Sequence, residues 1–91
     1  MKSLGILEYR GITGGLEAAD AMTKAADVNI LATQKIGNAL IYIVIEGTVS
    51  DIEAALAAGK RRIRELGEYY ASSVLPRPDP EVYKVIEVIS R

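Results

Sequence analysis

Glu17 and Asp20 are the first side chains in this 91-residue chain whose types and spacing can do chemistry. Two carboxylates three residues apart can act as acid and base or hold a cation. Asp20 also stands four residues before Lys24, which is the spacing of an ion pair on a solvated helix face. The solvated face needs no further assumption, so we predict no catalytic or metal site at these residues.

A basic segment, Lys60-Arg61-Arg62-Ile63-Arg64, offers a different chemistry, the binding of phosphate groups. It lies at the end of a predicted helix, where the helix dipole favours cations, and acidic residues follow at 65 and 68. We therefore predict an exposed helix face. Residues 11–15 are rich in glycine and precede a helix, but they lack the lysine and hydroxyl residue that complete a phosphate-binding loop.

The composition excludes several classes of function. The sequence has no His and no Cys, so the usual general base at neutral pH and the commonest ligands of transition metals are missing. Eleven basic and twelve acidic residues give a net charge of -1, whereas a nucleic-acid binder normally has a basic excess. The apolar runs are shorter than a membrane span, and the first residues lack a signal-peptide core. We expect a cytoplasmic protein that is not an enzyme, has no cofactor, and binds neither nucleic acid nor membrane.

The middle of the chain predicts the centre of a β-sheet. Two apolar runs, 29–36 and 39–46, are separated only by Gly37 and Asn38, and β-branched residues dominate the second run. Gly-Asn suits a two-residue turn, because glycine accepts the positive φ that such a turn requires at its first position. We therefore predict a tight β-hairpin.

On the N-terminal side of this hairpin, a strand from Leu4 precedes a helix. The helix is predicted from Leu16, because Leu16, Ala19, Met22 and Ala26 recur at helical spacing. The small residues in this stripe allow close approach to a sheet or to another helix.

On the C-terminal side, a second helix is predicted, and either Thr48 or Ser50 can cap its start. Residues 68–75 are predicted as a fourth strand, and residues 79–91 as a short amphipathic tail helix. The order β-α-β-β-α-β plus a tail predicts one α+β domain with its core over residues 4–78. We expect a four-stranded antiparallel sheet with both main helices on one face, in a ferredoxin-like or permuted arrangement.

Three features carry a resemblance to a known family: Lys24, the turn Lys35-Ile36-Gly37-Asn38-Ala39, and Pro76-Arg77-Pro78. From about Leu4 to Pro80, the chain resembles the single-domain hexameric shell proteins of bacterial microcompartments, which include carboxysomes and metabolosomes. The resemblance implies a structural protein whose cyclic hexamers tile edge to edge into shell facets. It also implies a central pore through which small metabolites pass.

The same resemblance implies which residues line that pore. The turns of the subunits meet around the sixfold axis in the family, so Lys35, Ile36, Gly37, Asn38 and Ala39 would line the aperture. Many relatives have Ser and then Gly after the turn's glycine, whereas this chain has Asn38 and Ala39. We therefore expect a tighter aperture that presents amide groups in place of hydroxyls.

At the edge between hexamers, the resemblance implies roles for Lys24, Asp27 and Arg77. Two prolines hold the backbone around Arg77 extended, so its fork of N–H donors projects from a stiff segment. Asp27 stands where relatives often have Asn. We expect Asp27 to pair with Lys24 and to make tiling sensitive to salt.

The expected partners are five further copies of the chain, other shell proteins at the edges, and small metabolites in the pore. The tail helix can pack on its own subunit, on a neighbour, or on an encapsulation peptide of a cargo enzyme. A second interpretation stays open at this point. It is a trimeric regulatory domain that binds a small molecule, with residues 61–64 on a phosphate group.

Overall fold

The computed structural model describes residues 2–11, 14–36 and 40–89. The predicted order of elements is confirmed, and strands β2 and β4 have the predicted bounds. The elements are β1 (Ser3–Arg10), α1 (Gly14–Ala25), β2 (Asn29–Ile36), β3 (Leu40–Gly47), α2 (Val49–Leu66), β4 (Glu68–Leu75) and α3 (Pro80–Ile89).

The four strands form one sheet in the order β2-β3-β1-β4, and each neighbouring pair is antiparallel. This order confirms the α+β class and the ferredoxin-like arrangement. Ser3 pairs with Gly47 at one end of the sheet, and Arg10 pairs with Leu40 at the other. The predicted turn residues, 37–39, lie outside the described residues, but β2 and β3 pair up to Ile36 and Leu40 on either side of them.

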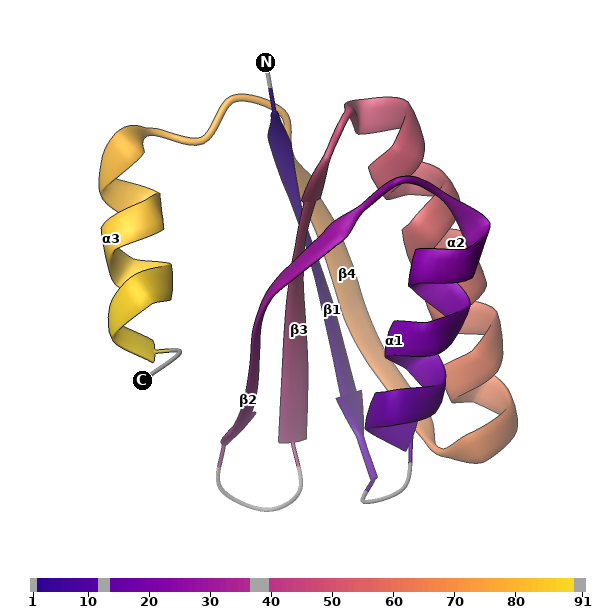
Figure 1. Cartoon of the computed structure of the whole chain (residues 1–91). Helices are drawn as coiled ribbons and strands as arrows, with labels where there is room; N and C mark the ends of the chain where they lie inside the picture. Colours follow the sequence, from indigo (N-terminus) through magenta and orange to yellow (C-terminus); the bar gives the residue numbers. More distant parts are fainter. Residues whose placement is uncertain (1, 12–13, 37–39, 90–91) are drawn as a thin grey trace.

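Helices cover both faces of the sheet (Figure 1). Helices α1 and α2 lie on one face, as predicted, and α3 lies on the other. Because side chains alternate along a strand, each face has its own core. Leu7, Ile43 and Ile45 face α1 and α2, whereas Leu4 and Val44 face α3. Each fully buried side chain of this size stabilises the fold by about 1.5–3 kcal/mol.

The apolar stripe predicted for α1 is wrong at its first residue. Leu16 is 87% exposed, and the buried positions are Gly14, Ala18 and Met22. These three lie four residues apart and carry small or flexible side chains, so this row allows the helix to approach α2 closely. The approach is close at Gly59 of α2, where an added Cβ would lie 2.8 Å from Cγ of Met22.

Thr48, one of the two residues that can cap α2, is the cap. Its Oγ1 accepts a hydrogen bond from the backbone N–H of Asp51 at 3.1 Å and donates to Oδ2 of Asp51 at 2.9 Å. Ser50 lies inside the first turn. At the other end, the helix stops at Gly67, whose φ of -162° is extended. Glycine is needed there because a Cβ would lie 2.9 Å from the carbonyl oxygen of Arg10.

The tail helix α3 packs on the sheet of its own chain, next to β2. Ile86 is buried, and Val82 and Tyr83 are half-buried against the second core. Val85, the neighbour of Ile86 on this helix, is 59% exposed. The face of α3 that packs on the sheet therefore includes Tyr83 and excludes Val85.

Candidate functional site

The strand ends that lead into the central turn belong to the β2–β3 pair. Lys35 is exposed and lies opposite Ile41, and the last described pair is Ile36 with Leu40. Gly37, Asn38 and Ala39 of the predicted pore lining lie outside the described residues. Leu40 also pairs with Arg10, so these ends of β2 and β3 lie at the end of the sheet where β1 finishes.

Arg77 lies at the opposite end of the sheet. It follows β4, whose last residue Leu75 pairs with Leu4, and its side chain is exposed. The buried hydroxyl of Ser3 donates a hydrogen bond of 2.6 Å to the carbonyl oxygen of Pro76. Ser3 thus fixes the segment that carries Arg77. The sequence gives no signal for this role, because a serine at a strand start is equally common on the surface.

Lys24 lies in the last turn of α1, and its side chain is 76% exposed. Its Nζ forms an ion pair with Oδ2 of Asp20 at 2.9 Å. This hydrogen bond and the charge of Asp20 raise the pKa of Lys24. The expected pairing with Asp27 is not formed among the described residues, because α1 ends at Ala25 and no longer places residue 27 on the same face.

Lys24 and Arg77 share one end of the domain, and Ile36 and Leu40, the last paired residues of β2 and β3, are at the other. Helix α1 begins after the end of β1 and runs back toward the start of β2, where Asn29 pairs with Glu46. An eight-residue strand has a length of about 23 Å between its terminal Cα atoms. Lys35 and Ile36 of the expected pore lining are therefore separated from the expected edge residues by the length of the sheet.

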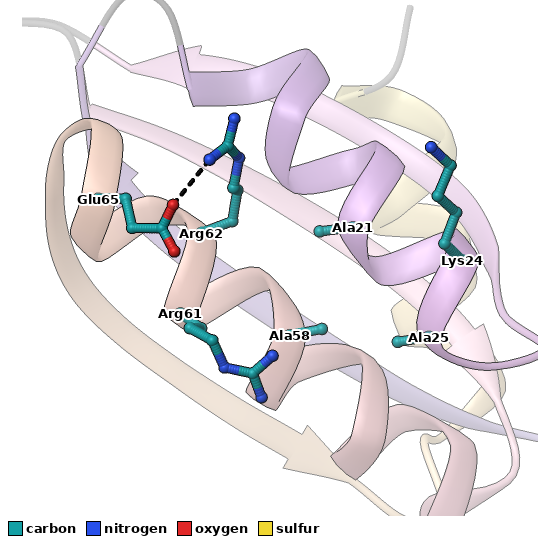
Figure 2. Close-up of a pocket in the computed structure, with 7 residues that line it drawn as sticks. All are labelled: Ala21, Lys24, Ala25, Ala58, Arg61, Arg62 and Glu65. Atoms are coloured by element: carbon teal, nitrogen blue, oxygen red, sulfur yellow. Dashed lines mark hydrogen bonds and ion pairs between the residues drawn. The ribbon is translucent and has the colours of Figure 1, made fainter.

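A shallow hollow of about 360 Å³ lies between α1 and α2 (Figure 2). Ala21 and Ala25 of α1 and Ala58 of α2 face one another there. Charged side chains surround these alanines. They are Lys24, Arg61, Arg62 and Glu65.

The basic segment at the end of α2 is largely engaged within the chain. Arg62 forms ion pairs with Glu17 at 2.9 Å and with Glu65 at 2.7 Å, and both carboxylates raise the pKa of Arg62. Nζ of Lys60 and Cζ of Arg64 lie 4.8 Å and 5.4 Å from the centre of the Tyr69 ring. These contacts favour the exposed helix face over a phosphate-binding site, because they already satisfy most of the cations.

Two kinds of feature are absent from the described ranges. In residues 2–11, 14–36 and 40–89, no helix has the length and apolar character that crossing a membrane requires. In the same residues, no three acidic side chains come together as metal ligands.

Sequence and structure comparisons agree on one family. The model of the BMC domain matches residues 3–78. The shell protein PduA of Citrobacter freundii is 40% identical over 85 residues, which cover 93% of this chain and 91% of the relative. EutM of Escherichia coli K12 is 35% identical over 88 residues, which cover 97% of this chain and 91% of EutM. The carboxysome shell protein CcmK2 of Thermosynechococcus vestitus is 33% identical over 88 residues, which cover 94% of this chain and 86% of CcmK2.

A solved microcompartment protein from Desulfitobacterium hafniense DCB superposes with a TM-score of 0.85 at 31% identity. The match covers all of this chain and 49% of that protein, so the chain spans about half its length. The relatives named above are structural shell proteins of microcompartments, which confirms the expectation of a protein that is not an enzyme. The chain belongs to the BMC domain family, the family of bacterial microcompartment shell proteins.

Proposed function

We propose that this protein forms cyclic hexamers that tile into the facets of a microcompartment shell. One observation carries the proposal. The paired strand ends Ile36 and Leu40 lie at one end of the domain, and Lys24 and Arg77 lie at the opposite end. A wedge-shaped subunit of a flat ring needs this separation, because its narrow end meets the rotation axis and its wide end meets the next ring.

At the axis, the turn of each copy lines a central pore. Lys35 and Ile36 lead into it from β2, and residues 37–39 form its rim. Rotational symmetry repeats each side chain around the ring, so one substitution changes the whole aperture. Small metabolites pass through this aperture, and the amide of Asn38 offers both donors and acceptors to them.

At the outer edge, Lys24 and Arg77 hold neighbouring hexamers together. Both side chains are exposed, and Ser3 fixes the segment that carries Arg77. A guanidinium on a stiff Pro-Arg-Pro segment loses little conformational entropy when it docks on the carbonyl groups of a neighbouring ring. Asp27 lies beyond the end of α1, next to this contact. Other shell proteins with a similar edge join the same lattice.

Helix α3 provides the surface that binds the encapsulation peptide of a cargo enzyme. Val85 and Val88 are 59% and 57% exposed on the side that faces away from the sheet. An amphipathic encapsulation peptide can cover such a pair at helical spacing.

The native mass of the purified protein, measured by light scattering after size-exclusion chromatography, tests the proposal. We expect a particle of six subunits that grows into flat sheets as the concentration rises, visible by electron microscopy. A monomer or trimer at every concentration contradicts the hexamer and the pore together. Saturable binding of a nucleotide by that trimer would instead support the regulatory domain.

A further inference from the structure

The exposed side of α2 carries separated charges. Glu53 is exposed near the start of the helix, and Arg61 and Arg64 are exposed near its end. Among the described residues, none of these three side chains forms an ion pair. Ala54 and Ala57 are exposed between them. We call the surface made of these five residues the outer α2 face.

The positive end of the outer α2 face has no compensating charge within the described part of the chain. Nζ of Lys60 and Cζ of Arg64 lie 4.8 Å and 5.4 Å from the centre of the same Tyr69 ring, so two like charges are held close together. Like charges four residues apart destabilise a helix, and an aromatic ring attracts cations without neutralising their charge. The carboxylate of Glu65 is already paired with Arg62 at 2.7 Å. A carboxylate from another molecule is therefore favourable at this end.

A hollow of about 510 Å³ lies at the same end of α2. Its floor is open because the side chain of Ala57 is a single methyl group. Cations surround this alanine, so the hollow can receive an acidic side chain. The lining residues are Ala57, Lys60, Arg61, Arg64 and Glu65.

A second copy of α2 supplies such an acidic side chain. Glu53 and Arg61 lie four residues before and four residues after Ala57, which places all three on one row of the helix. Consider two copies of α2 that lie antiparallel and cross at Ala57. Glu53 of each copy is then level with Arg61 of the other, because both lie about 6 Å along the helix axis from the crossing point. The outer α2 face is therefore complementary in charge to a second copy of itself.

We propose that the outer α2 face is a contact between two copies of this chain, related by a two-fold axis at Ala57. Glu53 of each copy enters the hollow of the other copy and pairs with Arg61. This contact goes beyond the proposed hexamer. A two-fold contact uses the same surface on both copies, whereas a ring of six joins two different surfaces of each subunit. The contact also uses neither Lys24 nor Arg77, so it joins subunits of separate rings without the proposed edge.

Cysteine cross-linking tests the contact and its register. The chain has no Cys, so a disulfide can form only between introduced residues of two copies. In Ala57→Cys, the two Cα atoms face each other at the axis, within the distance of about 4.4–6.8 Å that a disulfide allows. We expect oxidation by air and copper phenanthroline to convert most of the protein into a covalent dimer on a non-reducing gel.

Ala54→Cys is the matched control for this cross-link. The position is exposed on the same face, but its two Cα atoms would lie about 9 Å apart along the helix axis, too far for a disulfide. We expect at least several-fold less dimer than with Ala57→Cys. An absent dimer in Ala57→Cys, or equal yields from the two variants, overturns the proposed contact.

Exchange of the two charges examines the ion pairs. In the Ala57→Cys background, Glu53→Arg places two arginines level with each other, and Arg61→Glu places two glutamates level with each other. We expect each substitution to lower the dimer yield at least several-fold, and the two together to restore it, because the charges are again opposite. Both positions are exposed, so circular dichroism spectra should match wild type. Single variants with an unchanged yield, or a double variant without recovery, contradict the pairing of Glu53 with Arg61.

Native mass separates this contact from the ring. We expect Glu53→Arg to keep the six-subunit particle, and wild type at low ionic strength to form larger particles than Glu53→Arg does, because salt screens the exposed ion pairs. Loss of the six-subunit particle in Glu53→Arg would place α2 in the ring interface and overturn the two-fold contact. A monomeric wild type contradicts the proposed ring, whereas the Ala57→Cys dimer still decides the α2 contact.

Discussion

The hydroxyl of Ser3 donates a 2.6 Å hydrogen bond to the carbonyl oxygen of Pro76, which joins the start of β1 to the segment after β4 across 73 positions of sequence. The bond forms because β1 and β4 are antiparallel neighbours, so the start of one strand lies beside the end of the other. The hydrogen bond therefore fixes the position of the backbone between the end of β4 and Arg77.

Replacing Ser3 with Ala removes this bond while the neighbouring strands stay paired. We expect a loss of about 0.5–1.5 kcal/mol in the free energy of unfolding, the usual net worth of one hydrogen bond. Urea unfolding followed by circular dichroism measures it. Ser73→Ala, at an exposed serine of β4, is the control and should change stability by less than about 0.5 kcal/mol.

Arg77→Ala should leave the hexamer intact and abolish sheets. The guanidinium is exposed and forms no ion pair with the described residues of the subunit, whereas a docked guanidinium at the edge is repeated at every contact of a lattice. Electron microscopy of concentrated protein, together with native mass, separates the two levels of assembly. Arg61→Ala removes the same charge from α2 and should still give sheets. Loss of the hexamer in Arg77→Ala would place this residue in the ring interface instead.

Lys24→Asp should also impair tiling without unfolding the subunit, because the side chain is exposed and reversal of its charge repels the neighbouring edge. Asp20, which pairs with Lys24, then governs the response to salt. We expect Asp20→Asn to reduce the dependence of tiling on ionic strength, while Asp27→Asn has a smaller effect. Light scattering over a salt series measures this. A larger effect of Asp27→Asn would show that the edge contact rearranges the ion pair.

Thr48→Ala should destabilise the subunit by about 1 kcal/mol, because it removes the side-chain cap of α2. Ser50→Ala is the matched control, since Ser50 lies inside the helix and caps nothing. Thermal unfolding of both variants compares them. Equal losses would indicate that the helix start shifts to Ser50 when Thr48 is replaced.

Tyr9 gives the subunit a dependence on alkaline pH. Burial raises the pKa of its phenol above the ordinary value of 10.0. The unfolded chain then loses this proton before the folded chain does, so the free energy of unfolding falls as the pH rises above 10.0. Compared with wild type, Tyr9→Phe should reduce this fall between about pH 8 and about pH 11. Urea unfolding at both values measures it, and an equal fall with Phe would contradict the prediction.

The sequence by itself determined the order of elements and the α+β class, because hydrophobic periodicity and turn residues are local signals, whereas the strand pairing of the structure selected the ferredoxin-like arrangement over a permuted one. Glu68 to Leu75 illustrates this: two tyrosines at its start and Val74 and Leu75 at its end, between Gly67 and Pro76, indicate a strand without reference to the rest of the chain. The same local signals offered Thr48 and Ser50 as caps, and only the backbone at the helix start selected Thr48.

The tertiary structure decided which residues pack against one another and which remain exposed. Helical spacing put Leu16 on the packed stripe of α1, but that helix packs against α2 through its smallest residues and leaves Leu16 outside. The hydrogen bond from Ser3 to the carbonyl oxygen of Pro76 arises from a contact between segments that are distant in the sequence. Local patterns carry no information on such contacts, because the rotation of a helix about its axis and the neighbours of a strand are set by packing of the whole domain.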